Sequence, residues 1–315
     1  MTGGLFFLGW FAYLWFEPEV PPYRYQLIKE GPSAEFGKMD LETWPELKVS
    51  QYKVQADGID KPVAEFVTAR RENTPPVLMY WKNTTGEILY NLDRKPSELS
   101  LLAIAIGRHA PKDALILSWW DTSRQLKLLT GHDTLFTNHL NEPLMIPALW
   151  LEQKQSIQTY EAQFWESNPA AKERDQFKRF SQALVAPAQD GIKMLRQLVG
   201  SDRETYVIVH VTDLYKLGLM YPEAIGVAYQ NFPMTGNMHG MINQMKVQIK
   251  ENDFYTYTLQ SISDNEIRAF FLSDEASSQT LLARMLPFVD KTPPAELEIA
   301  QLIYQQGGYW VYKLP

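Results

Sequence analysis

Runs of apolar residues along the chain predict a mixture of strands and helices. Two continuous apolar runs, Ala114–Ser118 and Tyr206–Val211, are typical of strands that are covered on both faces. Alternating or clustered β-formers predict further strands nearer the N-terminus, at Tyr23–Lys29, Lys48–Val54 and Val77–Lys82. The pattern therefore predicts a β-rich beginning, followed by buried strands.

Helical periodicity lies between and beyond these strands. It predicts helices at Leu99–Ile106 (with Ser97 as N-cap), Ser123–Leu129, Glu142–Glu152, Ala171–Val185 and Asp190–Val199. The C-terminal third favours strands at Lys246–Lys250, Phe254–Gln260, Ile267–Leu272 and Tyr309–Leu314, with helices at Ser277–Val289 and Ala295–Tyr304. We expect an α/β fold in which a mixed sheet carries helices on both faces. Residues 31–315 would form this domain, within which 31–96 could be a smaller β-rich part.

The first 16 residues have a different character. Residues 3–16 read GGLFFLGWFAYLWF and contain no charge. As a helix this stretch would span about 21 Å, which is less than the ~30 Å hydrocarbon core of a bilayer. Prolines follow at once and begin a predicted linker over residues 17–30. This arrangement favours a membrane anchor at residues 1–16, with an interfacial segment or a buried core helix as alternatives.

Composition narrows the function classes. A hydrophobic content of 45% and a charged content of 21% are ordinary for a folded protein. The net charge of −7 argues against nucleic-acid binding, which needs a dense Lys and Arg surface. The absence of cysteine excludes disulfides, iron–sulfur clusters, thiol nucleophiles and C-x-x-C-H haem attachment. We therefore predict no cofactor.

The most distinctive stretch follows the predicted strand at 114–118. Trp119, Trp120 and Asp121 would form a partly apolar cup with one anion, in which the indoles supply cation–π surface and the carboxylate accepts hydrogen bonds. Asp121 could equally cap the helix that begins near Ser123. Other candidate binding residues follow in the same stretch: Arg124, Gln125 and Asn138.

Histidines supply the remaining candidates. His132 and His139 flank a predicted short strand, and a metal site that they share with Asp121 is an alternative to the cup. His239 lies in the Gly- and Met-rich segment Met234–Met241, which is predicted to be a loop that could cover a site. No phosphate loop, Gly-x-Ser-x-Gly or His-Glu-x-x-His motif is present. Binding is therefore favoured over catalysis, although an enzyme that uses Asp121 with a histidine stays open.

One resemblance rests on Trp119-Trp120-Asp121, with Gln125, Thr134-Leu135 and Asn138 downstream and Asp213–Met220 later. Residues 100–315 resemble the soluble C-terminal domain of the oligosaccharyltransferase catalytic subunit. In that family the WWD region recognises the hydroxyl residue of the acceptor. The membrane half that carries the family's catalytic carboxylates and metal has no counterpart here, so the resemblance implies a fold, a recognition cup and, as an alternative function, a transferase-like domain.

A second resemblance covers the whole chain. The apolar N-terminus, Pro22–Tyr25 and Ser-Trp-Trp-Asp-Thr-Ser-Arg-Gln at 118–125 resemble the hydroxylamine oxidation protein HaoB family. That family is associated with octahaem hydroxylamine oxidoreductase in ammonia- and methane-oxidising bacteria. The resemblance implies a periplasmic accessory protein that is tethered to the inner membrane and has the octahaem enzyme as its partner.

Overall fold

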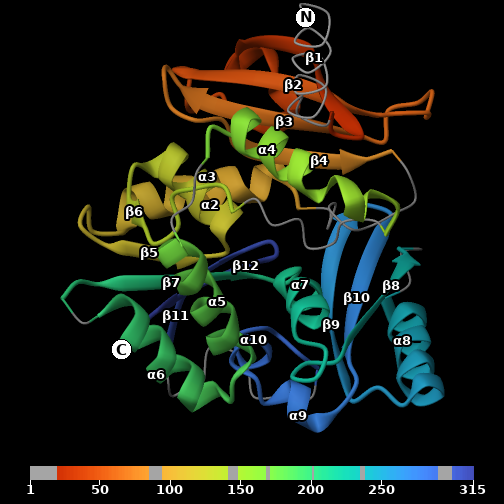
Figure 1. Cartoon of the computed structure of the whole chain (residues 1–315). Helices are drawn as coiled ribbons and strands as arrows, with labels where there is room; N and C mark the ends of the chain where they lie inside the picture. Colours follow the sequence, from red (N-terminus) through yellow and green to blue (C-terminus); the bar gives the residue numbers. More distant parts are fainter. Residues whose placement is uncertain are drawn as a thin grey trace, which may run out of the picture.

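A computed structural model describes residues 20–84, 94–140, 148–167, 171–200, 202–234, 238–289 and 300–315. The main body has four layers, which run from top to bottom in Figure 1 as sheet, helices, sheet and helices. A smaller sheet with its own helix stands beside the lower layers. The fold is thus α/β as predicted, but its strands form three sheets where one mixed sheet was expected.

The central sheet has five strands in the order β11-β12-β7-β5-β6. Their bounds are β5 (Leu115–Ser118), β6 (Asp133–Thr134), β7 (Thr205–His210), β11 (Gln301–Gln306) and β12 (Tyr309–Lys313). Strands β5, β6 and β7 are parallel, whereas β12 pairs antiparallel with β7 and β11. Both predicted buried strands are confirmed, because every residue of β5 and β7 is buried.

Helices cover both faces of this central sheet. The upper layer holds α2 (Pro96–His109) and α3 (Trp120–Thr130), and the lower layer holds α5 (Ala171–Val185), α6 (Ala188–Val199) and α10 (Leu281–Arg284). Tyr206 and Ile208 of β7 lie in the upper core, whereas Val207 and Val209 lie in the lower core. Successive side chains of a strand point to opposite faces, so one strand serves two cores.

The uppermost sheet is an antiparallel meander of β1 (Tyr23–Pro32), β2 (Leu47–Ala56), β3 (Ala64–Arg71) and β4 (Val77–Asn83). The short 3-10 helices η1 (Ser33–Glu35) and η2 (Gly37–Met39) follow β1. An aromatic cluster around Phe66 joins this sheet to α4 (Lys154–Phe164), which follows η3 (Ala148–Gln153). Residues 23–30, part of the predicted linker, lie in β1.

The third sheet has the order β8-β10-β9, from β8 (Val227–Pro233), β9 (Thr256–Ser263) and β10 (Glu266–Leu272). One face packs on α8 (Met238–Asn252), and Phe270 and Leu272 on the other face join the lower core. The remaining short helices are α7 (Asp213–Met220) and α9 (Glu275–Ser278).

Three C-terminal predictions differ from the structure. Residues 246–250, predicted as a strand, lie in α8, because Met245 and Ile249, four residues apart, contact the sheet while Val247 is exposed. Residues 301–304, predicted as helix, lie in β11, which pairs with β12. The predicted helix at 277–289 is replaced by the two short helices α9 and α10.

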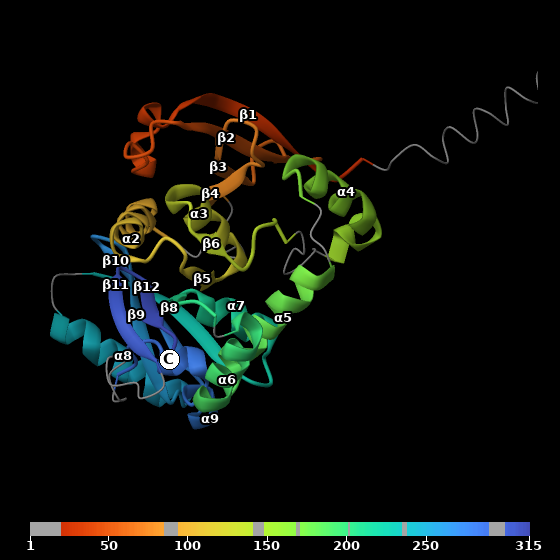
Figure 2. The same cartoon turned by 90° about the vertical axis from the view of Figure 1, so that its left-hand side faces the viewer.

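The N-terminal anchor assigned to residues 1–16 lies outside the described residues. Among the helices that the structure does describe, none combines the length and the apolar character needed to cross a bilayer. In Figure 2 the described part of the chain begins beside the uppermost sheet, near α4.

Candidate functional site

The Trp-Trp-Asp stretch sits at the carboxyl end of β5. The strand ends at Ser118 and α3 begins at Trp120, three residues before the predicted start. The N-cap position is occupied by Trp119, whose side chain makes no capping bond. Asp121 therefore lies in the first turn, where its Oδ1 accepts the Thr122 N–H at 2.6 Å. A carboxylate there is favoured by the free N–H groups and by the helix dipole.

Asp121 forms an ion pair with Arg94, a residue that the sequence did not single out. The Asp121 side chain is 11% exposed and that of Arg94 is 22% exposed. Arg94 also donates to Thr122 Oγ1 at 3.0 Å. Burial alone would raise the pKa of Asp121, but the charges of Arg94 and Lys216 hold it well below its usual value. Asp121 is therefore ionised, and the positive charge of Arg94 balances its negative charge.

Trp119 is a core residue that contacts a second ion pair, between Lys216 and Asp213. It is 3% exposed, and its ring meets Phe177 edge-on with centroids 5.0 Å apart. Lys216 Nζ lies 4.5 Å from the centroid of the same indole, in a cation–π contact. Lys216 also donates to Asp213 Oδ1 at 2.9 Å. The indole is therefore enclosed by its own protein.

Trp120 belongs to a second cluster, around His139. The His139 ring stacks on Trp165 at 4.3 Å and meets Trp120 edge-on at 4.6 Å. Arg124 lies 3.1 Å from His139 Nδ1 and donates to the Pro76 carbonyl at 2.8 Å. Burial, and then the charge of Arg124, lowers the pKa of His139 well below its usual value. The ring is therefore neutral, and Nδ1 accepts from the guanidinium.

Burial also lowers the pKa of Arg124, to about 10. Asp121 and Glu173 oppose that shift. Arg124 stays charged at neutral pH, so the cluster around His139 carries one buried cation.

Gln125, Asn138 and His132, also predicted site residues, bind partners other than Asp121. Gln125 donates to the Leu78 carbonyl at 2.7 Å, and Asn138 binds Glu173. His132 contacts the Pro111 carbonyl at 3.1 Å, and His239 lies in α8, with its side chain outside the described residues. Within the described ranges, no group of three His, Asp or Glu side chains could hold a metal ion. The alternative of a shared metal site therefore gains no support from His132 and His139.

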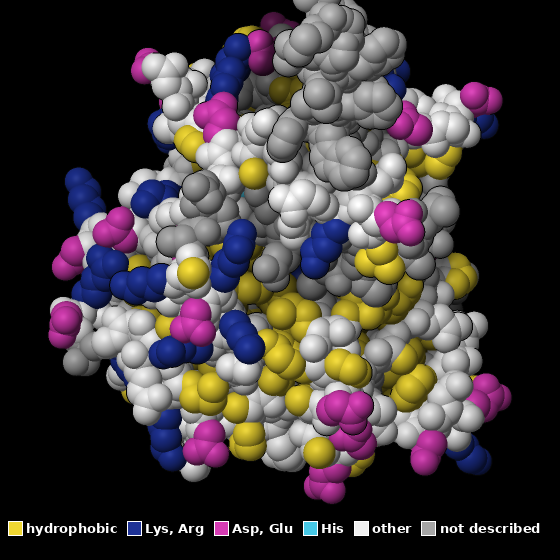
Figure 3. Space-filling model, viewed as in Figure 1, with side chains coloured by type: hydrophobic (Ala, Val, Ile, Leu, Met, Phe, Trp, Pro, Cys, Tyr) yellow, Lys and Arg dark blue, Asp and Glu magenta, His cyan; other side chains and the backbone are white. Residues whose placement is uncertain are grey.

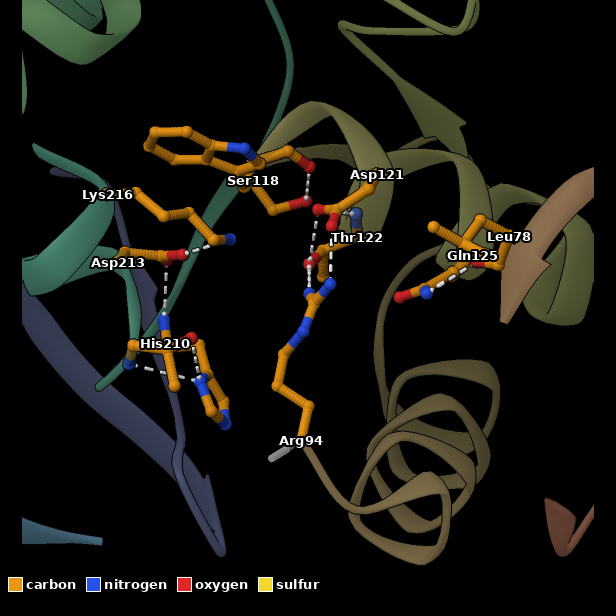
Figure 4. Close-up of polar contacts among 11 residues, drawn as sticks. Leu78, Arg94, Ser118, Asp121, Thr122, Gln125, His210, Asp213 and Lys216 are labelled. Carbon is orange, nitrogen blue, oxygen red and sulfur yellow. Dashed lines mark hydrogen bonds and ion pairs between the residues drawn. The ribbon is translucent and has the colours of Figure 1, made fainter. Parts of the chain in front are cut away.

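A matching arrangement follows β7. Asp213 lies three residues after the last residue of its strand, as Asp121 does after β5. Asp213 Oδ2 accepts the His210 N–H at 2.9 Å, and His210 Nδ1 lies 2.7 Å from Thr212 Oγ1. Figure 4 shows the two ion pairs facing one another beyond the ends of the parallel strands. The repeated strand-x-x-Asp spacing is the sequence signal that could have found this second half.

The arrangement is a paired-charge centre, which we define as Arg94, Asp121, His210, Asp213 and Lys216. Each carboxylate has its own cation: Asp121 of α3 pairs with Arg94 from the segment before α2, and Asp213 pairs with Lys216 of the same helix, α7. Such a centre fixes the geometry of two strand–helix junctions. The charges of Arg94 and Lys216 hold the pKa of Asp121 well below its usual value, so Asp121 is a poor proton donor at neutral pH.

Comparison with known proteins identifies a family. The family model described as "HaoA-associated protein HaoB" matches residues 1–314. No curated protein gives a significant match. Among solved structures, the crystal structure of the C. jejuni PglB C-terminal domain is similar at a TM-score of 0.37 and 11% identity, covering 69% of this chain and 99% of that one. A TM-score this low does not establish a shared fold.

Proposed function

Because the chain belongs to the HaoB family of HaoA-associated proteins, named for nitrification, we propose that it is an accessory protein that binds a multihaem hydroxylamine oxidoreductase. The match of the family model to residues 1–314 carries the proposal. In this role the chain contributes no covalently bound haem, because it contains no cysteine. The octahaem enzyme is the partner that we propose.

A binding role fits the chemistry of the paired-charge centre and of the cluster around His139. Asp121 and Asp213 are each neutralised by a cation, and His139 and His210 both have pKa values well below the usual one because they are buried. A general acid works best with a pKa near the working pH, whereas the pKa values of Asp121, His139 and His210 all lie well below their usual ones. The centre therefore serves better as a rigid support for a binding surface.

The proposed partner surface is the face that carries α5 and α7. Figure 3 shows Lys and Arg side chains over α5 beside hydrophobic side chains near the middle of this face. Leu219 of α7 is 38% exposed, and Lys172, Arg174, Lys178 and Arg179 of α5 are exposed. Apolar residues ringed by charged ones are typical of protein interfaces that form and dissociate.

We further propose a periplasmic location, with residues 1–16 as the tether to the inner membrane. The support is their uncharged apolar sequence, which precedes the prolines at 18, 21 and 22. Deletion of residues 2–16 should move the protein from the membrane fraction to the soluble fraction of osmotically lysed cells. Recovery of the full chain in the soluble fraction would contradict the tether.

The partner is tested by co-purification. The tagged full chain is mixed with purified hydroxylamine oxidoreductase, and haem absorbance is measured in the captured fraction. We expect haem to be captured, and Leu219→Asp to weaken capture at least tenfold, because a charge is buried in an apolar interface. The control is Leu101→Asp, at a residue that is 48% exposed on α2, and this helix lies on the opposite side of the molecule from α5 (Figures 1 and 2). Absence of haem from the captured wild-type chain would refute the proposal.

A further inference from the structure

Exposed apolar side chains gather at the beginning of β1. Val20 and Leu151, at 75% and 57%, are the two most exposed large apolar side chains of the described residues, and Ile59 is 47% exposed. They come from three separate segments: the residues before β1, the turn between β2 and β3, and η3. Single exposed apolar residues are ordinary on a protein surface, whereas a group of them marks a surface that something else covers.

Two contacts at the start of β1 bring these segments together. The Asp57 N–H donates to the Pro22 carbonyl at 2.9 Å, which holds the β2–β3 turn against the beginning of the strand. The Tyr23 ring lies 5.6 Å from the ring of Trp150, which holds η3 against the same residues. We call this surface the apolar end and define it as Val20, Tyr23, Ile59, Trp150 and Leu151.

The charged residues around the apolar end balance one another. The segments 20–24, 57–61 and 150–154 carry three exposed cations and three exposed anions: Arg24, Lys61, Lys154, Asp57, Asp60 and Glu152. A partner that is recognised by charge would need a surface of one sign. A lipid surface, in contrast, accepts apolar side chains that are flanked by Trp and Tyr rings, because these rings are apolar in the body and polar at one edge. The apolar end therefore fits a membrane interface better than a charged partner.

The apolar run of residues 3–16 ends close to this surface. Val20 follows Phe16 by four residues, and an extended chain spans at most about 3.6 Å per residue, or about 14 Å in all. A tether that holds Phe16 at the bilayer therefore brings Val20 to the bilayer surface as well. In Figure 2 the described chain begins near α4, and α8 lies at the opposite corner of the molecule.

We propose that the apolar end rests on the membrane surface, with Val20, Ile59 and Leu151 inserted among the lipid headgroups and the upper acyl chains. Each of these side chains removes apolar area from water on insertion, which is favourable. The Tyr23 and Trp150 rings take the interfacial position that amphipathic aromatic side chains prefer. This inference rests on the proposed tether and adds to it that the folded domain itself contacts lipid.

The test uses single cysteines as sites for a fluorescent label, which is unambiguous because the chain has no cysteine of its own. The full chain is labelled with the environment-sensitive dye NBD at Ile59→Cys or at Leu151→Cys, and circular dichroism checks that the fold is kept. It is then incorporated into phosphatidylcholine vesicles, with or without lipid that carries a nitroxide high on the acyl chain. The matched control is Val247→Cys, which is 50% exposed on α8.

We expect the nitroxide lipid to quench the labels at residues 59 and 151 and to leave the label at residue 247 unchanged. A chain that floats with the vesicles while its labels at 59 and 151 stay unquenched would overturn this inference and leave the tether standing. If those two labels are shielded from water but still unquenched, a second copy or another part of this chain covers the apolar end, and the inference is equally overturned. A chain that does not float with the vesicles would refute the tether and this inference together.

Discussion

Neutralising Asp121 should destabilise the protein, because it leaves Arg94 without its counter-ion. Breaking a fully buried ion pair from one side costs about 3–5 kcal/mol. The Arg94 side chain is 22% exposed, so water would partly solvate the orphaned guanidinium, and the expected loss falls to about 2–3 kcal/mol. Asp121→Asn keeps the shape of the side chain, so the loss of stability would measure the contribution of the negative charge. The measurement is urea unfolding followed by tryptophan fluorescence, with the slope on urea checked for constancy.

The matched control is Asp57→Asn, which breaks the exposed pair with Arg24. Those side chains are 58% and 64% exposed, so its effect should stay below about 1 kcal/mol. A double-mutant cycle with Arg94→Met should give a coupling energy of about 1–3 kcal/mol between residues 94 and 121. The reasoning is refuted if Asp121→Asn costs no more than Asp57→Asn, or if the coupling energy is zero.

Two further predictions follow from the buried histidines and the helical glycines. Because burial lowers the folded-state pKa of His139 and His210, only the unfolded chain binds these protons as the pH falls below about 6.5. As the pH falls from 6 to 5, the free energy of unfolding should therefore decrease by up to about 2.7 kcal/mol per pH unit. The decrease should be smaller in His139→Gln. Equal dependence of stability on pH in the wild type and in His139→Gln would contradict the inference that His139 is neutral in the folded protein. Gly107→Ala should stabilise α2 by up to about 1 kcal/mol, because the added Cβ would meet open space. Gly191→Ala should destabilise the protein, because its Cβ would lie 2.4 Å from the Ala183 carbonyl oxygen. Thermal denaturation of both variants tests these two expectations.

The sequence predicted correctly those strands and helices whose burial shows in the pattern of neighbouring apolar residues. The continuous apolar run at 114–118 gave β5 correctly, because a strand buried on both faces needs no polar alternation. The apolar residues around Val247 were wrongly predicted as a strand, because a helix and a strand can both place apolar residues two positions apart. In the structure Met245 and Ile249 contact the third sheet from one face of α8.

The site was predictable only in part, for a physical reason. Trp119, Trp120 and Asp121 are distinctive in the sequence, and they do lie at a strand end. Arg94 is 27 residues before its partner, and Lys216 reaches Trp119 across 97 positions, so both contacts exist only after β5 and β7 pair. The charge of Asp121 is balanced by Arg94, a partner that only the folded structure brings to it.

The most direct measurement of the central claim is sedimentation velocity of the full chain mixed with purified multihaem hydroxylamine oxidoreductase, recorded in the Soret band and in the ultraviolet. Because the chain has no cysteine and carries no covalently bound haem, Soret absorbance reports only the partner. The account predicts a Soret boundary that sediments faster when the chain is added and saturates at a fixed ratio of the two proteins. An unchanged Soret boundary at every ratio would contradict it.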